Sequence, residues 1–215
     1  MVKQVRAART RHALILAAAE VFAADGYAMA SLPSISKRAG VSAGALHFHF
    51  ASKDALAREV ETAAADSVEK MAERCRSAAD SSLQSLVHTT CSLLLAVTSD
   101  PVIRAGLKLS VDPSRKNGAG LVQWWSEWVH DLVVRAQASG ELADDLSPEG
   151  AAAAIVAATV GFEILGSRDG EWLSGERMVQ FWTFLLPRLA AASQLESALA
   201  AAETAAATAP GKTVY

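Results

Sequence analysis

The residues from Ser42 to Lys53 combine small, aromatic and basic side chains in a pattern that suits a phosphate-bearing partner. Gly44 stands inside a predicted short helix, where it costs about 1 kcal/mol relative to alanine, and both of its neighbours are alanines. Such a slim helix can approach a backbone or a base edge closely, and free N–H groups at a helix N-terminus bind phosphate well. Lys53 falls in the first turn of the next helix, where its charge opposes the helix dipole unless an external anion relieves it.

The elements that must position these residues form a predicted helix-turn-helix. Apolar residues at i, i+3 and i+7 define one face of a first short helix, with Ser31 as its N-cap. Gly40 stands where a helix end favours a left-handed residue. Ser42 then caps a second helix over residues 43–50. Two helices joined by three or four residues including glycine are typical of a DNA-binding unit whose second helix enters the major groove.

The rest of the chain shows helical spacing and no strand pattern, so the expected fold is all-α, with an N-terminal three-helix helix-turn-helix domain and a C-terminal helical domain. We expect domains over residues 1–52 and 53–195, followed by an alanine-rich tail, 196–215, that either prolongs a helix or frays. A mobile basic arm is predicted over residues 1–9, and Pro187 should kink the last long helix. The predicted longer helices span residues 10–24, 53–76, 81–98, 120–139, 148–166 and 174–192.

Basic residues are concentrated near the N-terminus. Residues 1–58 hold eight basic and three acidic residues, a net charge of +5, so the remainder carries −8 to give the total of −3. A basic segment on an acidic body is typical of a phosphate-facing surface, with chance fluctuation as the alternative. The eight basic residues are Lys3, Arg6, Arg9, Arg11, Lys37, Arg38, Lys53 and Arg58.

Composition and motifs exclude several classes of protein. With 215 residues, 51% of them hydrophobic and 20% charged, the chain is globular with a real core. Cys75 and Cys91 lack metal-ligand spacing and should be free and buried. His47 and His49 point to different sides of a helix, so no metal site is expected, and no cofactor motif is found. The N-terminus does not read as a secretory leader. The longest uncharged apolar run, 150–162, is too short to span a bilayer, so we expect a cytoplasmic protein without membrane contact.

A set of positions at fixed spacing carries a more specific signal: Ile15–Ala19, Phe22, Gly26-Tyr27, Ile35, Ala39–Ser42, Gly44, Leu46, His49-Phe50, Ser52-Lys53 and Leu56. In these residues the segment 10–60 resembles the DNA-binding region of the TetR family of transcriptional regulators. The resemblance implies a homodimer that reads the two half-sites of a palindromic, double-stranded DNA operator. It also implies that the C-terminal helical domain serves ligand binding and dimerisation.

The resemblance also assigns roles to residues. Four residues of the second helix would face DNA: Ala43, Gly44, His47 and Phe48. Three would contact phosphate: Ser31, Lys37 and Lys53. Arg6 and Arg9 are either solvated charges or an arm that adds salt-sensitive affinity. The family usually has threonine at Ser31, whose hydroxyl is retained, and tyrosine at His47, where an imidazole would make the phosphate contact sensitive to pH.

Within the family, the stretch GALHFHFASKDALA and the tryptophan-rich helix resemble the γ-butyrolactone autoregulator receptors most. Those repressors release DNA when a small diffusible lactone enters the C-terminal domain, and a tryptophan lines the lactone pocket. This implies a small apolar effector here, with Trp128 as the first and Trp125 as the second choice for that tryptophan, or both as ordinary core. Weaker pocket candidates, for which plain packing is the alternative, are Leu94, Val97, Ile103, Leu107 and Phe162.

Other functions remain open from the sequence. An orphan regulator of the same branch would bind DNA but sense an antibiotic or another lipophilic compound. An enzyme on a helical fold would need a catalytic set, and we find no Ser/His/Asp constellation, P-loop or metal-spaced carboxylates. A helical interaction module without DNA is disfavoured by the basic N-terminal segment and by Gly44. The small-residue helix 151–161 and the aromatic last helix are either core or dimer interface.

Overall fold

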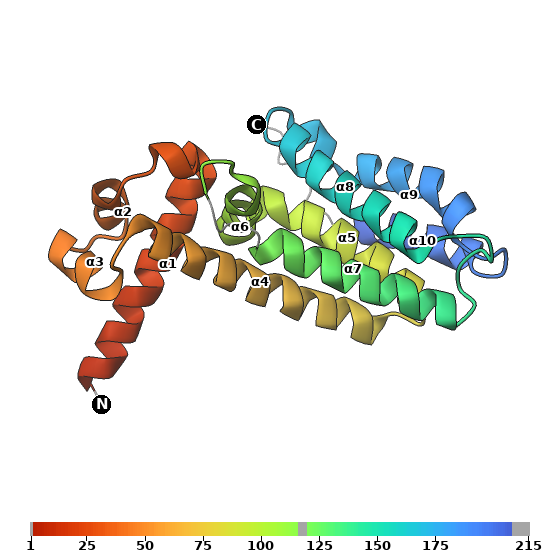
Figure 1. The fold of residues 1–215 in the computed structure, drawn as a ribbon, viewed down its shortest axis with the longest axis horizontal. Helices are drawn as coiled ribbons and strands as arrows, with labels where there is room; N and C mark the ends of the chain where they lie inside the picture. Colours follow the sequence, from red (N-terminus) through yellow and green to blue (C-terminus); the bar gives the residue numbers. More distant parts are fainter. Residues whose placement is uncertain (1, 116–119, 208–215) are drawn as a thin grey trace. The chain divides into compact units, whose positions relative to one another are not determined.

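The computed structural model describes residues 2–115 and 120–207 (Figure 1). These residues form ten α-helices and one short 3₁₀ helix, which confirms the all-α prediction. Their one β-contact is an isolated bridge between Leu142 and Ala190. The described residues divide into two compact units. The first contains residues up to Ser67 and from Asp100 to Gln123, and the second contains the others, so the division falls within α4, between α5 and α6, and within α7.

The first unit is built on α1 (Val2–Met29), which packs against α6 (Pro101–Val111) and contacts α2 (Leu32–Arg38) and α3 (Ala43–His49). The first turns of α4 (Lys53–Ala78) and of α7 (Gly120–Ala138) complete it. Gly26 interrupts the helical conformation of α1 with a φ of 75°. The core is formed by buried apolar side chains from these helices and from Phe50, which follows α3: Leu14, Ala18, Phe22, Ile35, Leu46, Phe50, Leu56 and Val60.

The predicted mobile arm is wrong, because α1 is already helical at Val2 rather than at residue 10. The sequence of this segment explains the difference. Alanine, arginine and glutamine are good helix formers, so the helix continues beyond the part that packs on the core. Arg6 and Arg9 are therefore exposed side chains on the first turns of α1.

The second unit is arranged around α5 (Ser82–Ser99), which packs against α8 (Pro148–Gly166), the 3₁₀ helix η1 (Gly170–Leu173), α9 (Gly175–Leu189) and α10 (Leu195–Ala207). Eleven of the 18 residues of α5 are buried, which identifies it as the central helix of this unit. The buried Glu141 carboxylate accepts hydrogen bonds from the N–H groups of Ser82 and Leu83 and so caps the α5 N-terminus. The C-terminal part of α4 and most of α7 belong to the same unit.

The end of the chain and the domain boundaries differ from expectation. The predicted tail begins with α10, whose buried alanines pack against α5 and α9, so much of residues 196–215 belongs to the second unit; residues 208–215 lie outside the described part. The boundary expected at residue 52 differs from the compact units, because α6 packs on α1. α9 ends at Leu189, two residues after Pro187, rather than continuing past a kink.

Two helices, Gln4–Met29 and Pro148–Gly166, are long and apolar enough to cross a membrane by length and composition alone, which the uncharged run 150–162 did not suggest. The apolar side of α1 is already used, since its residues form the core of the first unit. α8 differs, because much of its apolar surface is exposed and includes Ile164 and Leu165.

Candidate DNA interface and effector site

The turn between α2 and α3 is fixed by local hydrogen bonds. The Ser31 hydroxyl accepts from the Ser34 N–H, and the Ser31 N–H donates to the Ser34 hydroxyl, which completes a capping box. Gly40 has a φ of 66°, in the left-handed region that glycine adopts without strain. The Ser42 hydroxyl then accepts from the Ala45 N–H and caps α3. Both predicted caps and the predicted glycine are therefore confirmed as structural features.

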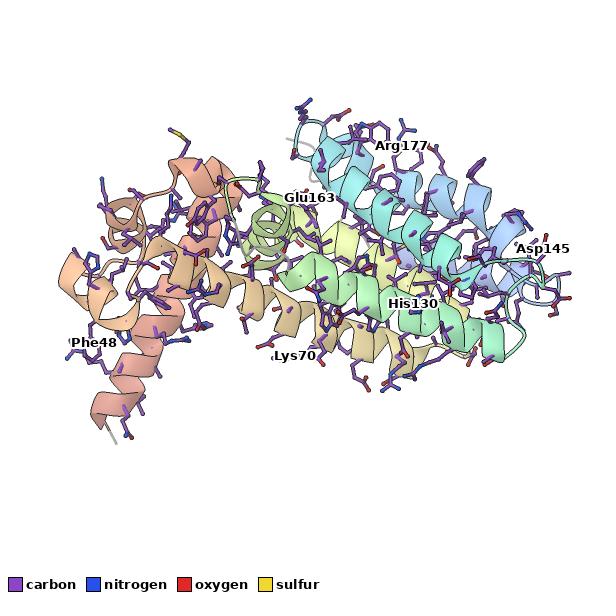
Figure 2. All side chains as sticks on the ribbon, viewed as in Figure 1. Phe48, Lys70, His130, Asp145, Glu163 and Arg177 are labelled. Carbon is purple, nitrogen blue, oxygen red and sulfur yellow. The ribbon has the colours of Figure 1, made fainter. Side chains whose placement is uncertain are left out.

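α3 has one buried and one exposed side. Leu46 is 1% exposed and anchors the helix, and Phe50 follows it in the core. The opposite side carries the four residues predicted to face DNA, all of them exposed: Ala43, Gly44, His47 and Phe48. A Cβ added at Gly44 would approach only the Ser42 hydroxyl, at 4.0 Å, so this side is open. Phe48 is 82% exposed and points away from α3 (Figure 2).

Lys53 has internal partners that the sequence did not indicate. Its ammonium donates to the carbonyl oxygens of Tyr27 at 2.7 Å and Ala30 at 2.9 Å, and it lies 4.3 Å from the centre of the Tyr27 ring. These contacts place the positive charge at the C-terminal end of α1, where a helix dipole favours a cation. The dipole cost that suggested an external anion is thus offset within the protein, and a phosphate contact by Lys53 remains a prediction.

The positive charge of the N-terminal segment is partly neutralised. Three of the eight basic residues of this segment are held in ion pairs: Arg11–Glu59, Arg38–Glu20 and Arg58–Asp54. Arg6, Arg9 and Lys37 are exposed and have no ion pair in the described part of the chain. Lys53 is bound internally, so Arg6, Arg9 and Lys37, with Ser31 exposed at the α2 N-cap, are the best-placed candidates for phosphate contacts among the described side chains.

A buried ionic cluster in the first unit was not predicted. Arg115 and Glu61, whose side chains are 1% and 6% exposed, form an ion pair at 2.8 Å. Arg115 also donates to the Leu109 carbonyl and lies 5.3 Å from the centre of the Tyr27 ring. Burial alone would lower the pKa of Arg115, but the hydrogen bond and charge of Glu61 outweigh burial and raise that pKa. The cluster fastens the turn after α6 to α4.

Trp125 is the better of the two tryptophan candidates for a buried ligand. Its side chain is 0% exposed, and its indole N–H has no hydrogen-bond partner among the described residues. Leaving such a donor unsatisfied costs about 1–3 kcal/mol. Trp128 is only half-buried and stacks on Trp125 with ring centres 5.1 Å apart. The assignment of either tryptophan to an effector site stays a prediction.

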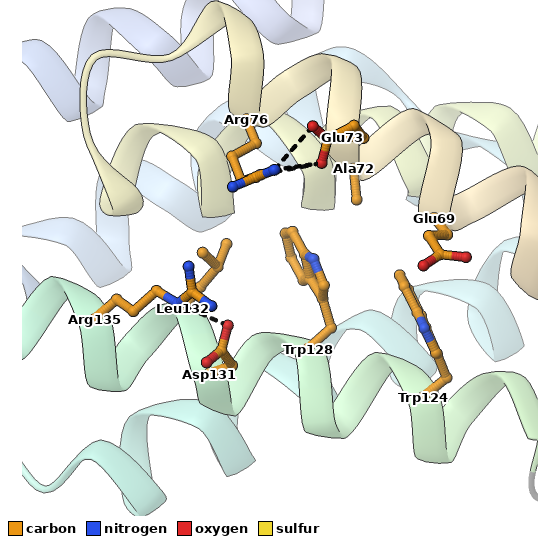
Figure 3. Close-up of a pocket in the computed structure, with 9 residues that line it drawn as sticks. All are labelled: Glu69, Ala72, Glu73, Arg76, Trp124, Trp128, Asp131, Leu132 and Arg135. Atoms are coloured by element: carbon orange, nitrogen blue, oxygen red, sulfur yellow. Dashed lines mark hydrogen bonds and ion pairs between the residues drawn. The ribbon is translucent and has the colours of Figure 1, made fainter.

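Trp128 lines a surface groove of about 310 Å³ between α4 and α7 (Figure 3). Its floor is aromatic, because Trp124 and Trp128 stack with ring centres 6.2 Å apart. Its rim is charged, and Arg76 and Arg135 pair there with Glu73 and Asp131 of their own helices. This groove is more polar than the apolar effector pocket that the sequence suggested for Trp128.

The weaker pocket candidates come from both units. Leu94 and Val97 are buried on α5 in the second unit, whereas Ile103 and Leu107 are buried on α6 in the first. Phe162 belongs to an aromatic group with Trp172 and Phe181. Plain packing accounts for all five side chains. Their assignment to an effector site stays a prediction.

The two cysteines are free, as expected, but their environments differ. Cys91 is buried, and burial raises the pKa of its thiol to about 12. Cys75 is only half-buried, with its sulfur 3.7 Å from the Ser92 hydroxyl. No group of three or more potential metal ligands occurs among the described residues.

Known proteins resemble this chain in the helix-turn-helix and in the helices that follow it. Residues 14–60 match the family model for bacterial regulatory proteins of the tetR family. Over 195 residues the chain is 33% identical to the A-factor receptor protein of Streptomyces griseus, in an alignment that covers 88% of this chain and 67% of that protein. The match thus extends well beyond the helix-turn-helix.

Solved structures agree over nearly the whole chain. A γ-butyrolactone receptor, an ArpA-like protein, has 25% identity and a TM-score of 0.78, with 94% of this chain and 97% of that chain covered. CprB from Streptomyces coelicolor, in complex with its biological operator sequence, has 26% identity and a TM-score of 0.78, covering 94% and 98%. TylP, a TetR regulator from Streptomyces fradiae, has 30% identity and a TM-score of 0.71, covering 93% and 99%.

Proposed function

Because this chain belongs to the TetR family of bacterial regulatory proteins, we propose that it is a transcriptional repressor that binds a palindromic operator as a homodimer and is released by a small γ-butyrolactone-type signal. It is a DNA-binding regulator and not an enzyme. The observation that carries the DNA-binding part is the exposed side of α3. The caps Ser31 and Ser42 and the buried Leu46 and Phe50 fix the orientation of this helix. We place this activity in the cytoplasm, where an operator is accessible.

Each half-site is met by one α3, with Ala43, Gly44, His47 and Phe48 toward the major groove. The exposed hydroxyl of Ser31 and the cations of Arg6, Arg9 and Lys37 lie on the same unit and supply phosphate contacts, which give affinity but no sequence preference. Lys53 acts mainly by holding the end of α1 against the start of α4, and so positions the unit. A dimer must place its two recognition helices about 34–36 Å apart, one turn of DNA.

The apolar face of α8 and α9 supports dimerisation. Ile164 and Leu165 on α8 are exposed, and Phe184 on α9 is 84% exposed. Large exposed apolar side chains on two helices of one unit are candidates for an interaction surface. The long, small-residue helix α8 also allows close approach of a partner helix. We assign this face to the contact between the two copies.

Trp125 supports the effector part of the proposal. A lactone presents a carbonyl oxygen that accepts a hydrogen bond, which is what the buried and unpartnered indole N–H of Trp125 lacks. The effector weakens operator binding only by the difference between its affinities for the free and DNA-bound conformations. The relatives named as A-factor and γ-butyrolactone receptors favour this class of signal over others.

Gel-shift titration with a palindromic duplex, with and without synthetic A-factor, tests the proposal. We expect operator binding without lactone and release with it. In Trp125→Phe we expect unchanged operator affinity but release at a lactone concentration about 10- to 100-fold higher, the equivalent of one lost hydrogen bond of about 1.4–2.7 kcal/mol. Trp128→Phe, the matched control in the surface groove, should respond like the wild type.

Two outcomes would contradict parts of this proposal. Operator binding that is unchanged at saturating lactone would indicate an orphan regulator that senses an antibiotic or another lipophilic compound, and a thermal-shift screen would then identify the compound. Equal lactone responses of the wild type and Trp125→Phe would remove Trp125 from the effector site.

A further inference from the structure

We propose that Phe48 determines operator specificity by recognising the methyl group of a thymine in each half-site. This inference rests on the proposed function, since it concerns how the open side of α3 reads DNA.

The side chains that α3 offers exclude most ways of reading a base. In the major groove, guanine is read by arginine or lysine, adenine by asparagine or glutamine, and cytosine by aspartate or glutamate. α3 consists of Ala43, Gly44, Ala45, Leu46, His47, Phe48 and His49, so it contains none of these types. Of the groove features that distinguish base pairs, only the thymine methyl is recognised by apolar contact. The exposed apolar residues of α3 are therefore suited to that feature.

Phe48 is the α3 side chain with the most apolar surface to offer. It is 82% exposed, whereas Leu46, the other large apolar residue of this helix, is 1% exposed and is used in the core. Phe48 and Gly44 are four residues apart and so share one helix face. Because Gly44 has no side chain and a Cβ there would meet only Ser42, this face can lie close to the base edges beside the Phe48 ring.

The Phe48 ring also has a neighbour that favours one orientation. The His49 ring lies edge-on to it, with ring centres 5.2 Å apart and planes at 84°. His49 is half-buried, and its ring centre also lies 6.4 Å from that of the buried Phe50. A ring with a preferred orientation loses less conformational freedom when it meets a methyl group than a freely rotating one. His47, also exposed, adds a single hydrogen bond rather than a bidentate one.

The test replaces single methyl groups on the DNA. Full-length protein first selects duplexes from a random library, and the recovered site is then synthesised with deoxyuridine at one thymine position at a time, in both half-sites. Deoxyuridine pairs like thymine and lacks only the methyl group. At one symmetric position we expect the operator affinity to fall about four-fold when one half-site carries deoxyuridine, which corresponds to the loss of one buried methyl group. With deoxyuridine in both half-sites the affinity should fall about 15-fold.

Protein variants then identify the side chain that reads the methyl. Phe48→Ala should bind the thymine duplex more weakly and should bind thymine and deoxyuridine duplexes equally. Phe48→Leu, the matched apolar control, should keep part of the difference. At the same position, 5-methylcytosine should bind more tightly than cytosine to the wild type but not to Phe48→Ala. Since Phe48 is exposed, these substitutions leave the core intact, and a thermal melt verifies this.

Each outcome decides between the alternatives. If deoxyuridine changes nothing at any position, or if Phe48→Ala still discriminates thymine from deoxyuridine, the proposal is wrong, and a uniform loss of affinity in Phe48→Ala would instead place the ring against the sugar-phosphate backbone. If the selection recovers no duplex at low salt, the proposed DNA-binding function itself fails, which is a different result from binding without methyl recognition.

Discussion

At the scale of single residues, the buried Glu61–Arg115 pair should contribute strongly to the stability of the first unit. Arg115 has nearly no contact with water, so its charge depends on two carboxylates, Glu61 at 2.8 Å and Asp54 at 3.5 Å. Glu61→Gln removes the nearer, buried carboxylate and leaves the buried cation with the more exposed Asp54 alone. We expect the free energy of unfolding, measured in urea, to fall by about 3 kcal/mol, the lower end of the cost of breaking a buried ion pair.

The matched control for this prediction is Glu20→Gln. It breaks the Glu20–Arg38 pair, in which both side chains are substantially exposed. Because water screens such pairs, the free energy of unfolding should change by about 1 kcal/mol or less. Equal effects of the two substitutions would show that the Glu61–Arg115 pair does not behave as a buried one.

Residue types predicted the local features of the helix-turn-helix well and its contacts with distant segments of the chain poorly. Ser31, Gly40 and Ser42 act within three residues of their own positions, so their roles as caps and turn were readable from the sequence. Glu61 and Arg115 are 54 positions apart, and only the folded chain brings them together. The same applies to Lys53, whose partners near Tyr27 lie 23 to 26 positions away.

At the scale of elements, the crossing of α6 over α4 depends on a glycine. A Cβ at Gly106 would lie 2.3 Å from the Cβ of Ala64, much closer than two carbon atoms can approach. Gly106→Ala must therefore separate the two helices. We expect a loss of about 1–3 kcal/mol in the free energy of unfolding, as for other overpacked cores, measured by chemical denaturation.

Gly150→Ala, on the first turn of α8, is the control for Gly106→Ala. Its added Cβ would lie 3.6 Å from the Ser147 hydroxyl, an ordinary contact. Alanine is the better helix former, so this change should be neutral or stabilising by up to about 1 kcal/mol. A neutral Gly106→Ala would mean that the helices separate at no cost.

Helix signals in the sequence predicted the elements but not all of their partners. The predicted helices 81–98, 120–139 and 148–166 correspond closely to α5, α7 and α8. Periodicity alone did not reveal α10, since an alanine-rich stretch shows little contrast between its faces, although four of its alanines are buried. Nor did it reveal that α6 packs on α1, a pairing between segments more than 70 residues apart in the chain.

At the scale of the whole molecule, the exposed apolar face of α8 and α9 should control assembly. Phe184→Arg places a charge at the most exposed large apolar residue of this face. Burying that charge in an interface would be unfavourable, so we expect sedimentation to show monomers. Because two half-sites must be held by two copies, operator affinity in gel-shift assays should fall at least 100-fold, by loss of bivalent binding.

Val134→Arg is the control for Phe184→Arg. Val134 is an exposed apolar residue of α7 in the same unit, away from α8 and α9 in the sequence. This variant should remain dimeric and bind the operator normally. A Phe184→Arg protein that sediments as a dimer would place the interface elsewhere.

The interleaved chain path has a practical consequence for dissecting this protein. The unit that carries α3 is assembled from two separate stretches, residues up to 67 and 100–123, and the second stretch supplies α6, which covers α1. An N-terminal fragment that stops after α3 or α4 would expose to water the surface of α1 that α6 covers. Chimaeras that exchange the second unit between relatives should therefore transfer α6 and the turn after it together with the first 67 residues. Otherwise the α1 surface must be changed to fit the α6 of the other protein.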